Sequence, residues 1–186
     1  EVAGYRISKA WAEEQHMYFV IRINKENSGG ELLLETKDGS TIKQAAIEDV
    51  KKGEKITVKV GISSVSIEGA RKNLESEAPH WDFDQYVADA KTKWEKALDK
   101  IQIATQDNTK KEIFYTALYH TMIVPNVFSD VDGKYRGMDL KIHESEEPVY
   151  TVFSLWDTFR ATHPLYTIIE QKKTNEFIRT FLKQYK

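Results

Sequence analysis

Four aromatic or polar residues near the end of the chain have the types and spacing of a sugar subsite. In the segment FSLWDTFRATHPL, Trp156 precedes Arg160 by four residues, and His163 follows Arg160 by three. If this segment is helical, these three side chains share one face and Asp157 lies beside them. An indole ring stacks on the apolar face of a pyranose, while carboxylate and guanidinium groups can each bind two neighbouring hydroxyls. We therefore predict that this face binds a monosaccharide.

The same spacing also fits a purely structural start of a helix. The run from Ser154 to Asp157 is a capping-box pattern. In that case Asp157 caps its own helix and pairs with Arg160, while Trp156 packs inward. His163 could likewise only support the loop before the following proline, which ends or kinks the helix. Spacing alone leaves both interpretations open.

A second group of candidates follows a predicted hairpin in the segment PNVFSDVDGKYRGMD. Asp132-Gly133 between extended segments is a strong signal for a two-residue hairpin turn. The same letters fit a calcium loop only weakly, because the remaining ligands and the closing glutamate are missing. Beyond the turn, Arg136 and Asp139 are candidate ligand-binding residues. The alternative is a local salt bridge in which Asp139 holds Arg136.

No two carboxylates in this sequence stand out as a general acid and a general base. Inverting glycosidases need one carboxyl group to protonate the leaving oxygen and another to activate a water. The acids here are local to one loop, as Asp130 and Asp132 are, or belong to the acidic run at 144–147. A nucleophile elbow and a phosphate-binding glycine loop are also missing. We therefore assign no catalytic residue and no metal ligand.

Together with FYTALYHT, these two segments resemble glycoside hydrolase family 92, the calcium-dependent, inverting exo-α-mannosidases. The segments KVGISSVSIEGARKNLE and GYRISKAWAEEQHMYFVIRI fit the region that precedes them in that family, so the resemblance covers nearly the whole chain. It implies a parent exo-α-mannosidase, with α-1,2 specificity, that acts on mannose-containing oligosaccharides such as N-glycans. A bound Ca2+ would engage mannose hydroxyls and help to distort the ring, while an acid and a base cleave with inversion.

The resemblance also implies roles for residues of this chain. The WDT-x-R pattern looks like part of the subsite that holds the terminal mannose, which places Trp156 and Asp157 first and Arg160 next. In the family, both catalytic carboxylates and most Ca2+ ligands look to lie beyond Lys186. We therefore expect a fragment that depends on the remainder of its own polypeptide and does not hydrolyse mannosides alone. The family also implies export to the periplasm, the medium or the cell surface.

Two other functions stay open. One is a carbohydrate-binding module that binds mannose without cleaving it. The other is a different (α/α)6 carbohydrate-active enzyme, such as a glycoside phosphorylase, in which a β-sandwich also precedes a helical barrel. A phosphate requirement would distinguish the phosphorylase from a hydrolase.

The composition is that of a folded globular protein and argues against several partners. Of the 186 residues, 40% are hydrophobic and 11% are aromatic. The net charge is -2, and no basic run is interleaved with aromatics, so we expect no nucleic-acid partner. No apolar run approaches the length of a transmembrane helix, so we expect no membrane insertion. The absence of cysteine excludes disulfides and thiolate metal sites.

The elements that must position these residues change type along the chain. Residues 1 to about 65 predict strands: Met17 to Ile23 places alternate apolar residues on one face, Glu31–Glu35 is a second candidate, and Ile56–Ile62 reads as a half-buried strand. From Ile67 the apolar spacing becomes helical. A longer helix follows, with Trp94 expected in the core.

Further helices are predicted in the last part of the chain. Thr109 to Glu112 is a capping box for a helix that runs to about Val124 and is apolar nearly all round, so we expect it to be buried. A last amphipathic helix follows Thr174. Strands followed by helices indicate an α+β fold. With the resemblance, residues 1–75 are predicted as the later part of an antiparallel β-sandwich, 76–104 as a linker helix, and 105–186 as the beginning of an (α/α)6 barrel.

Overall fold

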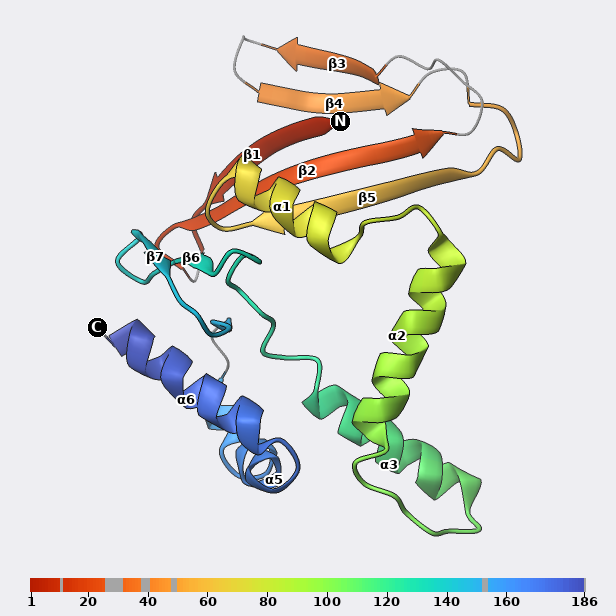
Figure 1. Cartoon of the computed structure of the whole chain (residues 1–186), viewed down its shortest axis with the longest axis vertical. Coiled ribbons are helices and arrows are strands. Elements are labelled where there is room, and N and C mark those ends of the chain that lie inside the picture. Colours follow the sequence, from red (N-terminus) through yellow and green to blue (C-terminus); the bar gives the residue numbers. More distant parts are fainter. Residues whose placement is uncertain (11, 26–31, 38–40, 48–49, 152–153, 186) are drawn as a thin grey trace.

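The chain has a mixed α+β fold with antiparallel sheets, as predicted. The structure, a computed structural model, describes residues 1–10, 12–25, 32–37, 41–47, 50–151 and 154–185. Figure 1 shows the main sheet and α1 at one end, the other helices at the opposite end, and α2 running between them. In chain order the elements are β1 (Val2–Ser8), β2 (Gln15–Lys25), β3 (Leu32–Lys37), β4 (Thr41–Ile47), β5 (Ile56–Ser63), α1 (Ile67–Glu77), α2 (Phe83–Leu98), α3 (Asn108–Thr121), β6 (Lys134–Arg136), β7 (Ile142–Glu144), α4 (Leu155–Thr158), α5 (Thr162–Ile169) and α6 (Gln171–Tyr185).

Three antiparallel strands in the order β1-β2-β5 form the main sheet, and α1 packs across one face of it. The core between them consists of Val20, Ala70 and Leu74, none of which is more than 3% exposed. α1 approaches β5 closely at Gly61, where a Cβ atom would lie 2.3 Å from the carbonyl oxygen of Ala70. A side chain at this position would therefore push the helix off the sheet.

The alternation predicted for Ile56–Ile62 is present, but within this chain the apolar side chains lie on the face of the sheet that α1 does not cover. Val60 and Ile62 are 57% and 59% exposed, whereas Gly61 and Ser63 are buried. The reason is steric, because α1 can lie close to the sheet only over small side chains. The larger aliphatic side chains therefore point away from α1.

A second antiparallel pair, β3 and β4, includes the strand predicted around Glu31–Glu35. The observed strand β3 begins at Leu32, and Glu31 lies outside the described residues. A register shift between Glu35 and Thr36 interrupts the pairing. Asp38-Gly39, a dipeptide that predicts a turn after this strand, also lies outside the described residues.

A charged cluster joins the first residue of the chain to β2 and α1. The Glu1 carboxylate accepts hydrogen bonds from Arg71 Nη2 and Arg22 Nε, each at 2.8 Å. Arg22 also donates to Glu75 of α1 at 2.7 Å. The hydrogen bonds from Arg71 and then Arg22 lower the pKa of Glu1 to about 2. This carboxylate therefore stays ionised well into acid.

Replacing Glu1 by glutamine is expected to lower the free energy of unfolding by about 0.5–1 kcal/mol at neutral pH. The effect is small because the carboxylate and both arginines are partly exposed to water, which weakens their attraction. The folded-state pKa of Glu1 lies below its unfolded value of 4.5, so its contribution is present above that pH and is lost as the pH falls towards 2. Urea unfolding of both chains at neutral pH and at about pH 3 measures the difference. Glu77→Gln, at an exposed position on α1, is the control. A difference that did not shrink in acid would contradict the ionic origin.

α2 connects the two ends of the molecule and is exposed along its length. Asp82 caps it by accepting from the Gln85 N–H at 3.1 Å, and none of its sixteen residues is buried. Trp94, expected in the core, is only half-buried. Its ring packs on Tyr119 of α3, with ring centroids 4.6 Å apart.

The predicted capping box at Thr109–Glu112 was wrong, as was the predicted end near Val124. α3 begins at Asn108, and its N-cap is Asp107, whose side chain accepts from the Lys110 N–H at 3.1 Å. It ends at Thr121. Only Leu118 is buried in it, because α2 covers just one of its sides.

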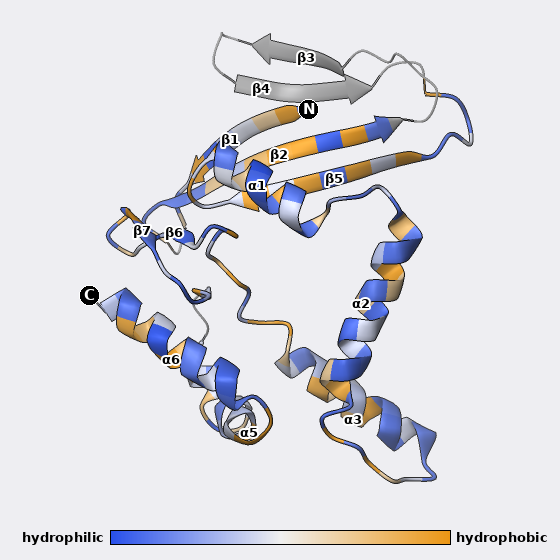
Figure 2. Cartoon of the chain, in the orientation of Figure 1, coloured by the Kyte–Doolittle hydropathy of each residue, from blue (hydrophilic) through white to orange (hydrophobic). Residues whose placement is uncertain are grey.

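The second core lies between α5 and α6. Tyr150, Tyr166 and Phe177 are buried there, and Met122 and Phe181 are among the apolar residues packed around them. Figure 2 shows hydrophobic and hydrophilic bands alternating along α6, as an amphipathic helix requires. The helix itself was predicted correctly, although it begins before the predicted start at Thr174.

Candidate functional site

The segment with the predicted sugar subsite forms two short helices and not one. α4 ends at Thr158 and α5 begins at Thr162. Ser154 is the N-cap of α4, but its side chain makes no capping hydrogen bond, so the predicted capping box was wrong. Its carbonyl oxygen instead accepts from Thr158 Oγ1 at 2.8 Å. Pro164 lies in the first turn of α5, where a missing N–H removes no helical hydrogen bond.

Trp156 and Asp157 face solvent. The Trp156 side chain is 87% exposed, so the interpretation in which it packs inward is wrong for this chain. Asp157 is also exposed, and within the described part of the chain its carboxylate has no hydrogen-bond or ionic partner, Arg160 included. The Arg160 guanidinium lies 5.3 Å from the centre of the Phe159 ring. An aromatic face, an acceptor and a donor are thus open to a ligand on one short segment.

His163 has a structural contact that the sequence left undecided. Its Nε2 atom lies 2.9 Å from Thr158 Oγ1, and this hydrogen bond spans the break between α4 and α5. It therefore supports the exposed turn, in agreement with the structural alternative.

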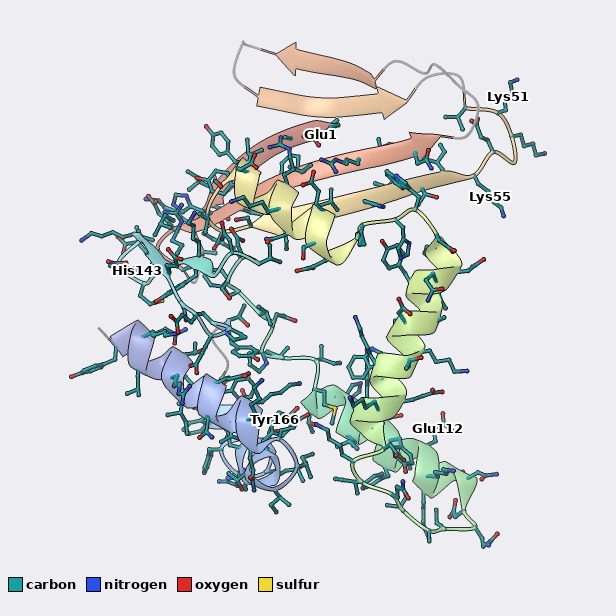
Figure 3. All side chains as sticks on the ribbon, in the orientation of Figure 1. Glu1, Lys51, Lys55, Glu112, His143 and Tyr166 are labelled. Carbon is teal, nitrogen blue, oxygen red and sulfur yellow. The ribbon has the colours of Figure 1, made fainter. Side chains whose placement is uncertain are left out.

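Arg136 and Asp139 lie on the hairpin formed by β6 and β7, and each binds protein atoms. Arg136 donates from Nε to the Ser64 carbonyl at 2.9 Å and from Nη1 to the Leu140 carbonyl at 2.7 Å. Asp139 Oδ1 lies 2.9 Å from Nε2 of His143, which Figure 3 labels beside β7. This hydrogen bond lowers the pKa of Asp139. The salt bridge considered between Asp139 and Arg136 is therefore replaced by two separate contacts.

The turn predicted at Asp132-Gly133 is present but one residue longer. The Gly133 N–H donates to the Asp130 carbonyl at 2.9 Å, and the Asp130 N–H donates to the Lys134 carbonyl at 2.8 Å. Gly133 has a φ of 84°. This pattern is a three-residue loop that ends in a left-handed glycine, so the prediction of a two-residue turn was wrong. The strands β6 and β7 pair across a different turn, at 137–141.

Asp130 is a buried polar residue to which the sequence gave no role. It is 5% exposed, and its two carboxylate oxygens accept from Ser63 Oγ at 2.7 Å and Asn73 Nδ2 at 2.8 Å. Asn73 Oδ1 in turn accepts from the Val131 N–H at 2.9 Å. Burial raises the pKa of Asp130, and the two hydrogen bonds oppose this. The cluster fixes the turn to β5 and α1.

The two aspartates of the weak calcium pattern serve contacts within the protein. Asp132 Oδ2 lies 3.1 Å from Lys72 Nζ and 3.4 Å from Lys134 Nζ. Among the residues described, no three His, Asp or Glu side chains converge as a cation site would require. None of the described helices is long and apolar enough to cross a membrane.

Comparison with known proteins places this geometry in a family. The sequence profile of the Glycosyl hydrolase family 92 catalytic domain matches residues 69–186. The solved family GH92 α-mannosidase BT3965 from Bacteroides thetaiotaomicron is 35% identical and aligns with 98% of this chain at a TM-score of 0.86. That protein has also been solved in complex with mannoimidazole. The Family GH92 Inverting Mannosidase BT2199 from the same organism is 24% identical over 91% of this chain, with a TM-score of 0.72, which supports the fold alone.

A curated relative from Arthroderma benhamiae, described as an uncharacterized secreted glycosidase, is 29% identical over 111 residues, or 57% of this chain. The chain spans 26% of the length of BT3965 and 13% of that relative. The profile covers more than half of the chain, and the BT3965 alignment extends through the sheet that precedes it. This chain belongs to glycosyl hydrolase family 92.

Proposed function

We propose that the protein containing this chain is an exo-α-mannosidase that releases terminal mannose from mannose-containing glycans. Membership of the family and the likeness to BT3965, an α-mannosidase, support this proposal. The observation on this chain that carries it is the open pair Trp156 and Asp157. An exposed indole leaves a large apolar face in water, and with an unengaged carboxylate beside it this face suits a pyranose.

We assign the recognition of mannose to α4 and the residues after it. The Trp156 ring would stack on the sugar, the Asp157 carboxylate would accept from neighbouring hydroxyls, and Arg160 would donate to a ring or hydroxyl oxygen. His163 would keep the turn in place through Thr158. Arg136 and Asp139 remain predicted ligand residues, and each would have to exchange a protein partner for the sugar.

Cleavage with inversion requires an acid and a base that this chain does not provide as a recognisable pair. We place both in the remainder of the polypeptide. The described residues do not fit a Ca2+ site of their own. If the parent uses this ion to bind mannose hydroxyls, most of its ligands come from elsewhere in the polypeptide.

The domain arrangement predicted above is part of the proposal. Residues 1–75 would complete an N-terminal β-sandwich, 76–104 would link it to the catalytic domain, and 105–186 would open an (α/α)6 barrel. Preference for α-1,2-linked mannose in substrates such as N-glycans, and export of the protein, also belong to the proposal. The curated relative is named as a secreted glycosidase, which is consistent with export.

The experiment is to express the complete reading frame that contains this chain and to follow hydrolysis of α-1,2-mannobiose by proton NMR. We expect β-mannose as the first product, because inversion converts the α-linkage to the β-anomer. The 186-residue chain alone should show no turnover. Mannose binding without cleavage by the complete protein would favour a binding module. Cleavage that needs phosphate would favour a phosphorylase.

A further inference from the structure

The connection between α1 and α2, residues 78–82, forms an elbow that is attached to the sheet. Lys59 of β5 donates from Nζ to the Ala78 carbonyl at 2.7 Å. The same Nζ atom lies 4.2 Å from the centre of the Trp81 ring. An ammonium group over an indole face is attracted by the electrons of the ring. One lysine of the sheet therefore contacts both the first and the fourth residue of the elbow.

The elbow is also attached to the start of α2. The Tyr86 hydroxyl accepts from the His80 N–H at 3.1 Å and donates to the His80 carbonyl at 2.8 Å. The two rings stack, with centroids 4.2 Å apart and planes inclined by 18°. Asp82, the last residue of the elbow, is the N-cap of the helix. A movement of the elbow is therefore passed on to α2.

Packing on the sheet does not fix the direction of α2. None of its residues is buried, and its aromatic contact with α3 lies near its far end, between Trp94 and Tyr119. Figure 1 shows α2 leaving the end of α1 and running away from the sheet toward α3. Beyond α3, the contacts of Asp130 with Ser63 and Asn73 return the chain to the sheet. The angle of α2 therefore depends on how the elbow at its start is held.

Lys59 is half-buried and depends on its two contacts with the elbow. Burial, and then the nearby Arg22, lower the pKa of Lys59. A charged group that leaves water is costly unless partners compensate it, and the Ala78 carbonyl and the Trp81 ring do so here. A neutral side chain of similar length would remove both contacts and leave the Ala78 carbonyl without this donor.

We propose that Lys59 and Trp81 form a latch that sets the direction in which α2 leaves the sheet. The latch concerns the placement of the helices and not a ligand, so it does not depend on the function proposed above. Without it, α2 would tilt about the elbow but would not come free, because the contacts of Asp130 still hold the chain beyond α3. A tilt of about 10° at the base of a helix about 24 Å long moves its far end by about 4 Å.

The latch is tested by measuring a distance across the elbow. This chain contains no cysteine, so Arg6→Cys on β1 and Lys96→Cys in the last turn of α2 can carry a pair of nitroxide labels. Both positions are exposed. By pulsed electron paramagnetic resonance, we expect Lys59→Met to change the mean distance by about 4 Å or to broaden its distribution by as much. Lys59→Arg, which keeps a cation over the ring and a donor for the carbonyl, should restore the original distance.

Two controls separate the angle of α2 from the integrity of the sheet. A second label pair, Arg6→Cys with Ser76→Cys, lies within the unit formed by the sheet and α1, so its distance should not change in Lys59→Met. Lys91→Met removes an exposed lysine of α2 whose ion pair with Glu95 is 3.9 Å long, and it should leave both distances unchanged.

Trp81→Leu is the second variant of the latch, because it removes the ring but leaves Lys59 its carbonyl acceptor. We expect it to change the distance between the labels at positions 6 and 96 by less than Lys59→Met does. An unchanged distance in both variants would overturn the proposal. An equal change between the labels at positions 6 and 76 would also overturn it, because Lys59 would then hold the sheet itself together.

Discussion

Asp157→Ala is expected to lower kcat/KM of the complete enzyme on α-mannosides by about 10²- to 10⁴-fold. The carboxylate is exposed and without a partner in the described chain, so its hydrogen-bonding capacity is free for two sugar hydroxyls. Each hydrogen bond to a charged group contributes roughly 1.5–3 kcal/mol, and alanine removes both. Steady-state kinetics on an aryl α-mannoside measure the loss.

Two matched variants show whether that loss is specific. Trp156→Ala should also reduce activity strongly, while Trp156→Phe should retain part of it, because a smaller ring still stacks. Glu112→Ala removes an exposed acid on α3 and should change nothing. Thermal unfolding of the site variants should stay near wild type, since both side chains are exposed. Full activity in Asp157→Ala would remove this residue from the sugar site.

The spacing of apolar residues in the sequence predicted the helices well, although the predicted capping boxes and the two-residue turn were wrong. The spacing of Ile67, Ala70 and Leu74 indicated one face of a short helix, and Ala70 and Leu74 are the buried face of α1. This succeeds because a helical face is set by residues three or four apart, whatever else surrounds it. The same logic located α2 and α6.

The sequence could not show contacts between distant residues. The alternation in β5 identified which residues share a face, but not which face α1 would cover, and the small residues decided that. The break in the helix after Thr158 has no strong local signal either. Because of this break, His163 contacts Thr158 and does not share a face with Trp156 as predicted. The two residues therefore have separate roles. Whether the site residues bind mannose remains a prediction.

Asp130 is the clearest case of a residue whose importance only the fold reveals. Its partners Ser63 and Asn73 lie 67 and 57 residues earlier in the chain, so no motif could pair them. Together they connect the turn before β6 to the end of β5 and to α1. The connection matters for Arg136, which follows this turn by two residues. Arg136 donates to the carbonyl of Ser64, and Ser64 is the neighbour of Ser63 in the same cluster.

Asp130→Ala is therefore expected to lower the free energy of unfolding by about 2–4 kcal/mol, because two donors lose their acceptor in a buried place. Asp132→Ala, whose carboxylate contacts partly exposed lysines, should cost at most about 1 kcal/mol and serves as the control. The folded-state pKa of Asp130 is raised above its unfolded value of 3.8, so protonation of this carboxyl group stabilises the folded chain. That stabilisation is fully present below pH 3.8 and declines as the pH rises through the folded-state pKa. Urea unfolding at neutral pH and at about pH 4 should thus show the larger difference between wild type and Asp130→Ala at the lower pH. Equal costs for the two aspartates would mean that the buried contacts with Ser63 and Asn73 do not fix this turn to the sheet.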